Sequence, residues 1–330
     1  MQEIIFHDFL SSRGCSPEEI DRQVNIILKM ETNLQKSVPS WTLEDLNSSS
    51  TQAAVNELID NGENSPENLI VMLRYAKAID NRDMFKTLFA MLDGYEAMDN
   101  LSKKLAEHVG DELRDTVFED LPLPPLGLSK PDKARYTYRI MKRMGEIFDE
   151  QVCREILSDS LRDLPDAYYA ECKTEFYEIC KANIDQYLKF KGQKFIDTLR
   201  DHKQRGELFF GQEITDDVID FVKGNPEMGG GIRSGDVIYE TKIPYNTKAY
   251  LAEIDPEKKR YHYCHCPWVK ESIRHDTLKI SATFCQCSAG FHKKPYEIIY
   301  ESKLKSEVLM SVLWGDPVCR FAIYIPEQPK

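Results

Sequence analysis

The sequence predicts an α+β fold, with an N-terminal all-α bundle followed by helices and a mostly antiparallel sheet that has helices packed on one side. Three observations lead to this class. Apolar residues recur at helical spacing up to about residue 120, four prolines fall within residues 121–131, and apolar and polar side chains alternate from residue 247. We therefore expect an acidic all-helical domain over 1–120, a Pro-rich linker over 121–131 and an α+β domain over 132–330.

Helix start signals place the elements of the first domain. Ser16 and Pro17, followed by two glutamates, predict a helix N-terminus, because serine caps the first turn, proline fits it and acids favour its positive end. Ser65 and the proline after it repeat this signal. Helical spacing over 84–91 and 98–109 completes the expected bundle.

The α+β domain is expected to begin with helices and to end with a sheet. The expected helices cover 134–158, 167–202, 215–224, 268–274 and 288–300, and the expected strands cover 237–241, 249–254, 260–266, 278–286, 304–313 and 318–325. The last two strands form a hairpin, because Gly315 and Pro317 between them favour a turn. From residue 247 the predicted order is β-β-α-β-α-β-β.

The composition of the sequence indicates in which cellular compartment we expect the protein. No stretch approaches the roughly 20 apolar residues that a membrane span needs. The first ten residues carry acids and a histidine where a signal peptide would need a basic and then an apolar run. Nine cysteines without a secretion signal indicate reduced thiols, so we expect a cytoplasmic protein with no membrane partner.

The net charge of -12 lies entirely in the N-terminal part. Residues 1–120 contain 11 Lys and Arg against 23 Asp and Glu, which leaves 32 of each kind in the remainder. A surface this acidic repels a phosphate backbone, so we expect no nucleic-acid partner.

Cysteines and histidines gather late in the chain, where five of the nine cysteines and four of the seven histidines follow residue 260. On a strand, Cys264 and Cys266 would point to one face, and so would Cys285 and Cys287. If the two strands pair in register, the four sulfurs converge within reach of one zinc ion. These four cysteines are therefore the candidate metal ligands.

A second interpretation of the same residues uses helix ends. Cys266 and Cys287 each precede an expected helix, whose positive end would lower the pKa of the thiol and favour the thiolate. Either cysteine would then be a catalytic nucleophile, with a histidine such as His265 as its base. A third interpretation, in which the thiols are structural or line a ligand pocket, stays open beside these two.

The stretch FCQCSAGFHKKPYEIIYESKLKSEVLMSVLWGDPVCRF, over 284–321, resembles the C-terminal signature of vinyl-reductase-type small-molecule-binding domains. Its most specific part is the hairpin motif Gly-Asp-x-x-Cys-x-Phe over 315–321. Together with CHCPW over 264–268, the stretch also resembles uncharacterised bacterial proteins grouped near the 2-amino-thiazoline-4-carboxylate hydrolase family. The resemblance covers about 249–325.

This resemblance implies an α+β fold with a pocket between sheet and helices for small, often apolar ligands. Some sensor relatives bind zinc through a Glu-x-x-Cys pair and the hairpin cysteine. Here Val308 and Ser311 occupy the first two positions and only Cys319 matches, so that zinc site is not implied. No catalytic set of the hydrolase relatives can be matched.

These observations predict a sensor-like protein whose small-molecule-binding region is 247–326. Its thiol-rich pocket would be lined by Trp268, Ser288, Phe291 and His292, with zinc as one option for a cofactor. The alternative is a hydrolase of small C–N or C–S substrates that uses a cysteine thiolate or zinc-activated water. A second alternative is a protein-interaction scaffold. Whether the chain is an enzyme stays open, as does its oligomeric state, for which a homodimer is one option.

Overall fold

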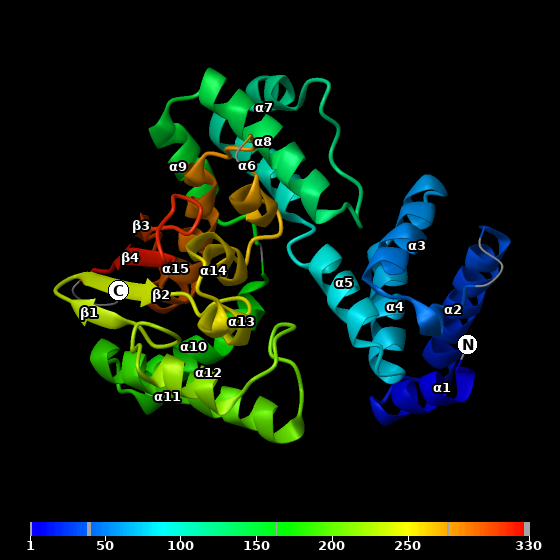
Figure 1. Ribbon diagram of the computed structural model, residues 1–330. Coiled ribbons are helices and arrows are strands. Elements are labelled where there is room, and N and C mark those ends of the chain that lie inside the picture. The colour runs from blue at the N-terminus through cyan, green and yellow to red at the C-terminus, as the bar shows by residue number, and fades with distance from the viewer. Residues whose placement is uncertain (1, 38–40, 163, 276, 327–330) are drawn as a thin grey trace. The chain divides into compact units, whose positions relative to one another are not determined.

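The computed structural model describes residues 2–37, 41–162, 164–275 and 277–326, and the fold is α+β as predicted (Figure 1). The chain forms two compact units, the first over Met1–Tyr95 and Pro124–Lys133 and the second over Glu96–Leu123 and Ala134–Lys330. This division differs from the expected boundary at residue 120. The reason is that helix 98–109 buries its apolar face in the core of the second unit.

The first unit is all-helical. Its elements are α1 (Glu3–Ser12), α2 (Pro17–Ser37), a 3₁₀ turn (Leu43–Asp45), α3 (Ser48–Asp60), α4 (Pro66–Ala78) and α5 (Arg82–Leu92). The helices predicted from Ser16 and Ser65 are confirmed, and the Ser65 hydroxyl accepts a hydrogen bond from the Asn68 amide at 3.1 Å. Their apolar faces form one buried cluster that includes Phe6, Ile27 and Tyr75.

The proline segment contains no helix over 121–129, as predicted. Part of it packs against the first unit instead of spanning freely. The Gln52 amide donates to the Gly127 carbonyl at 3.2 Å, and the Asn64 amide donates to the Leu126 carbonyl at 2.9 Å. These bonds satisfy backbone carbonyls of a segment whose prolines cannot form a helix.

The second unit combines helices with a four-stranded antiparallel sheet of order β1-β2-β4-β3 (Figure 1). Its helices are α6 (Ala97–Val109), α7 (Asp111–Phe118), α8 (Lys130–Ile147, whose first residues belong to the first unit), α9 (Glu150–Ser158), α10 (Ala170–Thr174), α11 (Ile184–Arg205), α12 (Asp216–Lys223), α13 (Thr247–Ala252), α14 (Pro256–Tyr263) and α15 (Gln286–Tyr300). Its strands are β1 (Ile232–Ser234), β2 (Val237–Thr241), β3 (Lys305–Met310) and β4 (Arg320–Tyr324).

Shorter turns of helix join these elements. They are 3₁₀ turns over Asp166–Tyr169, Lys270–Arg274 and Ala282–Cys285, and a π-helical turn over Glu175–Ile179. The predicted helices 134–158 and 167–202 are therefore interrupted. Asp149 caps a new helix within the first range, and Asn183 caps a new one within the second.

Strand β2 and the C-terminal hairpin of β3 and β4 are confirmed, but the predicted strands 249–254, 260–266 and 278–286 are wrong. The first two ranges are largely helical, in α13 and α14, and the third leads through a 3₁₀ turn into α15. Local capping explains the error. Asn246 and Asp255 each accept a hydrogen bond from the first turn of a helix, which outweighs a short alternation of apolar residues.

Helix α15 covers one face of the sheet. Ile238 of β2 pairs with Ile323 of β4, so both side chains lie on the same face, where they pack with Tyr296 and Ile299 of α15. Because strand side chains alternate, Glu240 also points to this covered face. The sheet therefore brings a charged side chain under a helix.

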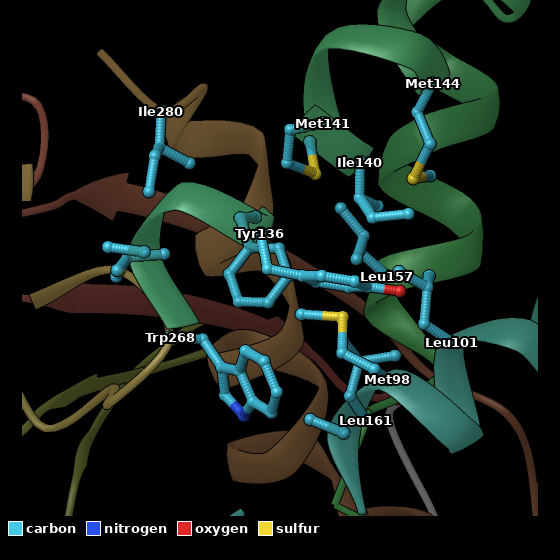
Figure 2. Close-up of a cluster of buried hydrophobic side chains, with 14 of the residues drawn as sticks. Met98, Leu101, Tyr136, Ile140, Met141, Met144, Leu157, Leu161, Trp268 and Ile280 are labelled. Carbon is cyan, nitrogen blue, oxygen red and sulfur yellow. The ribbon is translucent and has the colours of Figure 1, made fainter. Parts of the chain in front are cut away.

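A second buried cluster joins α6, α8 and α9 to the segment after α14 (Figure 2). Met98, Ile140, Met144 and Leu157 are among its members, with Trp268 against Tyr136 at 6.3 Å between ring centroids. This cluster fixes the loop that carries two of the cysteines. Within the described parts of the chain, no helix has both the length and the apolar character to cross a membrane.

Candidate functional site

Three polar side chains of α15 lie on its sheet-facing side. Ser288, His292 and Tyr296 are four residues apart, a spacing that repeats one helix face because a turn takes about 3.6 residues. The Ser288 hydroxyl accepts a hydrogen bond from the Lys242 ammonium at 2.9 Å. His292 Nδ1 and the Tyr296 hydroxyl lie 2.5 and 2.6 Å from carboxylate oxygens of Glu240. We call Glu240, Lys242, Ser288 and His292 the α15 site.

Glu240 is a buried carboxylate with a full set of donors. The Lys191 ammonium contacts it at 2.5 Å and also lies 3.1 Å from the Tyr296 hydroxyl. Burial alone would raise the pKa of Glu240, but the attraction of Lys191 and the hydrogen bond from His292 lower this pKa from 4.5 to about 2. The carboxylate is therefore ionised, and since it only accepts, His292 Nδ1 donates to it.

His292 stays neutral at ordinary pH. Burial lowers its pKa below 6.5, although Glu240 acts in the opposite direction. Its ring also packs on Phe321, with 4.7 Å between the centroids. An imidazole held at Nδ1 by a carboxylate keeps Nε2 available as a hydrogen-bond acceptor, the arrangement by which a histidine exchanges protons in catalysis.

Lys242 follows β2 directly and is fixed through its backbone. Its amide donates to the Cys319 carbonyl at 3.0 Å, and the Tyr263 hydroxyl donates to its carbonyl. The side chain is half-buried. The backbone contacts place its ammonium beside α15, where Ser288 accepts from it.

Five cysteines come from segments that surround the α15 site. Cys264 is the C-cap of α14 and Cys266 follows it, Cys285 precedes α15 and Cys287 lies in its first turn, and Cys319 precedes β4. None of them lies on a strand, so the predicted convergence of two paired C-x-C strands is wrong. Among the described residues, no group of three or more His, Cys, Asp or Glu side chains is placed to hold a metal ion.

The thiols nevertheless lie within electrostatic reach of one another. Burial, together with the neighbouring Cys264 and Cys287, raises the pKa of Cys266 from 9.0 to about 12. Burial likewise raises the pKa of Cys287, against the lowering effect of an amide hydrogen bond from Leu161. A nearby helix N-terminus was expected to lower the pKa of these two thiols, whereas burial raises it. Neither candidate nucleophile is therefore a thiolate at neutral pH.

Alkylation tests this assignment. A rise of three pKa units lowers the thiolate fraction roughly a thousandfold, and the thiolate is the reactive form. We expect iodoacetamide to modify Cys266 far more slowly in the native protein than in the urea-unfolded chain, as measured by peptide mass spectrometry, with Cys15 of the first unit as internal reference. Equal rates for Cys266 or Cys287 in the two states would restore the nucleophile hypothesis.

His265, the predicted base, is held by the backbone. Its Nε2 lies 2.6 Å from the Ile243 carbonyl, which can only accept, so Nε2 carries the proton. Burial lowers the pKa of His265 well below 6.5, and the nearby Lys242 adds to this effect. A neutral imidazole anchored in this way orients the segment after α14.

The four predicted pocket residues separate into two groups. Ser288 and His292 belong to the α15 site. Phe291 next to them is half-buried, and the guanidinium carbon of Arg162 lies over its ring at 5.9 Å from the ring centroid. Trp268 is only 3 % exposed and lies in the apolar cluster of Figure 2. Its expected place in a pocket wall is corrected to a place in the core.

Glu240, Lys242, Lys191 and Tyr296 were not predicted as site residues. A signal for Glu240 was present, because it follows Ile238 by two positions and a charged residue on the apolar face of a strand is unusual. Lys191 and Tyr296 could not be found in this way. They meet Glu240 only through the packing of α11 and α15 on the sheet.

Comparison with known proteins identifies one matching family. A family of unknown function (DUF6144) matches residues 250–330, which include α15, β3 and β4 but not β2 with Glu240 or Lys242. No curated protein and no solved structure matches the chain. Because the matching family has no described function, the resemblance to vinyl-reductase-type domains and to the hydrolase family stays a prediction.

Proposed function

We propose that the second unit binds a small organic molecule at the α15 site, as a sensor-like ligand-binding module. One observation carries the proposal. Polar and thiol side chains from four separate segments meet around α15, and those of Lys242, Ser288, His292, Cys266 and Cys287 all remain half-buried. Side chains used only for packing are normally covered completely, whereas ligand sites combine an apolar lining with a few convergent polar groups.

The charge state of these groups also supports binding over thiol chemistry. Burial keeps the nearby thiols protonated, and a protonated thiol behaves as a small apolar side chain. The polar groups that remain, Lys242, Ser288 and His292, are held in place by partners on α15 or β2. Such preorganised groups select a ligand with little ordering cost.

A fragment screen tests the proposal. We expect some small organic fragments to bind the native chain in saturation-transfer NMR and to lose binding in Ser288→Phe, which removes the hydroxyl partner of Lys242 and adds a bulky ring beside it. Gln193→Phe, at an exposed position of α11, is the matched control and should keep binding. If Ser288→Phe fails to fold, Ser288→Val replaces it. A library without binders, or binders indifferent to Ser288, would refute the proposal.

One observation favours hydrolysis of a small C–N substrate as a second candidate function. The Glu240–His292 pair lies one helical turn from the Lys242–Ser288 pair, so a general base and a polarising cation are close together. The thiolate form of this hypothesis is not supported by the raised thiol pKa values. If the candidate holds, bound fragments with an amide or amidine bond are cleaved, and His292→Gln abolishes cleavage while binding persists.

A further inference from the structure

Within the described parts of the chain, Lys242 is one of several lysines that form no ion pair with a carboxylate. Among the described residues, its ammonium lies within ion-pair distance of no carboxylate, and its one side-chain hydrogen bond goes to Ser288. An ammonium has three donors, so this bond leaves two of them for a ligand or for water. Exposed lysines such as Lys248, by contrast, pair with a nearby glutamate.

The groups around Lys242 do not neutralise it. Its charge acts on Cys264, Cys266, Cys287 and Cys319, which are thiols and not thiolates because burial raises the pKa of each. The two nearby imidazoles, of His265 and His292, are kept neutral by burial, which lowers the pKa of each. The thiols and imidazoles nearest the ammonium are therefore neutral, while the carboxylates of Glu96, Glu271 and Asp316 act on the same thiols from outside this group.

The one buried carboxylate of the site is already compensated. Glu240 lies two residues before Lys242, but its oxygens contact Lys191, Tyr296 and His292. The Lys191 charge balances the Glu240 charge, which leaves Lys242 as one uncompensated positive charge at the α15 site. A half-buried charge without a counterion is costly, and an anionic ligand would remove that cost.

We propose that the ligand of the α15 site is a small carboxylate that pairs with the Lys242 ammonium and accepts a further hydrogen bond from Ser288. This deepens the proposed function and rests on it. The Ser288 hydroxyl accepts from Lys242 and so keeps its own proton to donate. Two donors side by side match the two oxygens of a carboxylate.

The site selects a single negative charge. Lys242 compensates one charge, whereas a phosphate monoester brings nearly two and would leave an excess in a thiol-lined, apolar surrounding. A phosphate and a carboxylate share the anionic chemistry, so the test separates them.

Thermal shift measurements with acetate, acetamide and inorganic phosphate at matched ionic strength test the proposal. Acetate carries the carboxylate of the proposed ligand with the least additional bulk. A ligand that binds only the folded state raises the Tm in proportion to its saturation. We expect acetate to raise the Tm of the native chain, acetamide to leave it unchanged and phosphate to act less than acetate.

Two variants locate the effect. Lys242→Met should lower the acetate affinity by more than about thirtyfold, because it removes one partner of a desolvated charge pair. Lys248→Met, which removes an exposed lysine paired with Glu213, should leave the acetate effect intact. Lys242→Arg keeps the charge and should retain part of the effect, so a folding defect of the methionine variant would be recognised.

The outcomes separate the two proposals. An acetate effect no greater than that of acetamide, or one that survives in Lys242→Met, would overturn the carboxylate assignment. Neutral fragments that bind native protein but not Ser288→Phe would in that case leave the ligand-binding proposal standing. Stronger stabilisation by phosphate than by acetate would replace the carboxylate with a doubly charged ligand and so also overturn the assignment.

Discussion

Gly290→Ala is expected to destabilise the second unit strongly. A Cβ at Gly290, in the middle of α15, would lie 2.3 Å from the Ser158 carbonyl oxygen and 2.9 Å from the Ser160 amide nitrogen. These are backbone atoms at the end of α9, so they cannot rotate away as a side chain would. Overpacking of this kind lowers the free energy of unfolding by about 1–3 kcal/mol. Because the neighbouring backbone atoms are rigid, we expect the loss for Gly290→Ala to reach or exceed the upper limit of this range. Urea unfolding of the variant measures the loss.

Gly145→Ala is the matched control for this prediction. Gly145 also lies inside a helix, α8, but an added Cβ would meet nothing within 4 Å. Alanine lowers the entropy of the unfolded chain and favours a helix, so we expect a gain of about 0.4–1 kcal/mol. Equal stability of the two variants would mean that α15 does not approach α9 as closely as described.

Glu240→Gln should have the second large effect. The change removes the one negative charge among Lys191, His292 and Tyr296 and leaves the Lys191 ammonium without a counterion. Removal of one member of a buried ion pair costs about 3–5 kcal/mol. Glu301→Gln removes an exposed glutamate paired with Lys173 and should change the unfolding free energy little. Equal losses in the two variants would contradict the buried network.

The same substitution should flatten the acid limb of the stability curve. The folded protein holds the pKa of Glu240 at about 2, below its ordinary 4.5, so the unfolded chain binds more protons between these values. Its stabilising contribution is therefore complete above about pH 4.5 and is lost as the pH falls toward 2. Glu240→Gln lacks this dependence, which unfolding experiments across that range would detect.

Two histidines add to acid sensitivity at higher pH. Burial holds the pKa of His265 and His292 below 6.5, so the unfolded chain takes up their protons first as the pH falls. Stability should therefore begin to fall below about pH 6.5 in both the native chain and Glu240→Gln. The difference between the two curves contains the carboxylate contribution together with the further fall in the pKa of His292, which Glu240 raises.

Local signals explain what could be predicted of the fold. The helix from Ser65, strand β2 and the hairpin of β3 and β4 follow from caps, alternation and turn residues that lie within a few positions of each other. The strands expected over 249–286 failed because short amphipathic helices also alternate for a few residues. The caps at Asn246 and Asp255 were the better signal there.

Only some residues of the α15 site could be predicted from the sequence. Ser288 and His292 stood out because they fall among cysteines at the start of a helix. Lys242 did not stand out in the sequence. Its proposed role depends on the side chains that surround it in the fold, which are neutral thiols and a glutamate already paired with Lys191. A missing counterion is a property of three-dimensional packing, and no spacing in the chain encodes it.

The sheet order limits what the family-matched stretch can do by itself. Residues 250–330 supply β3 and β4, but β4 hydrogen-bonds on its other side to β2, which lies before that stretch. A protein that carried only the matched stretch would present the backbone of β4 as an open edge, and such edges recruit foreign strands. Any relative that shares only these residues must therefore bring a substitute for β2 from elsewhere, and with it a different set of partners for His292.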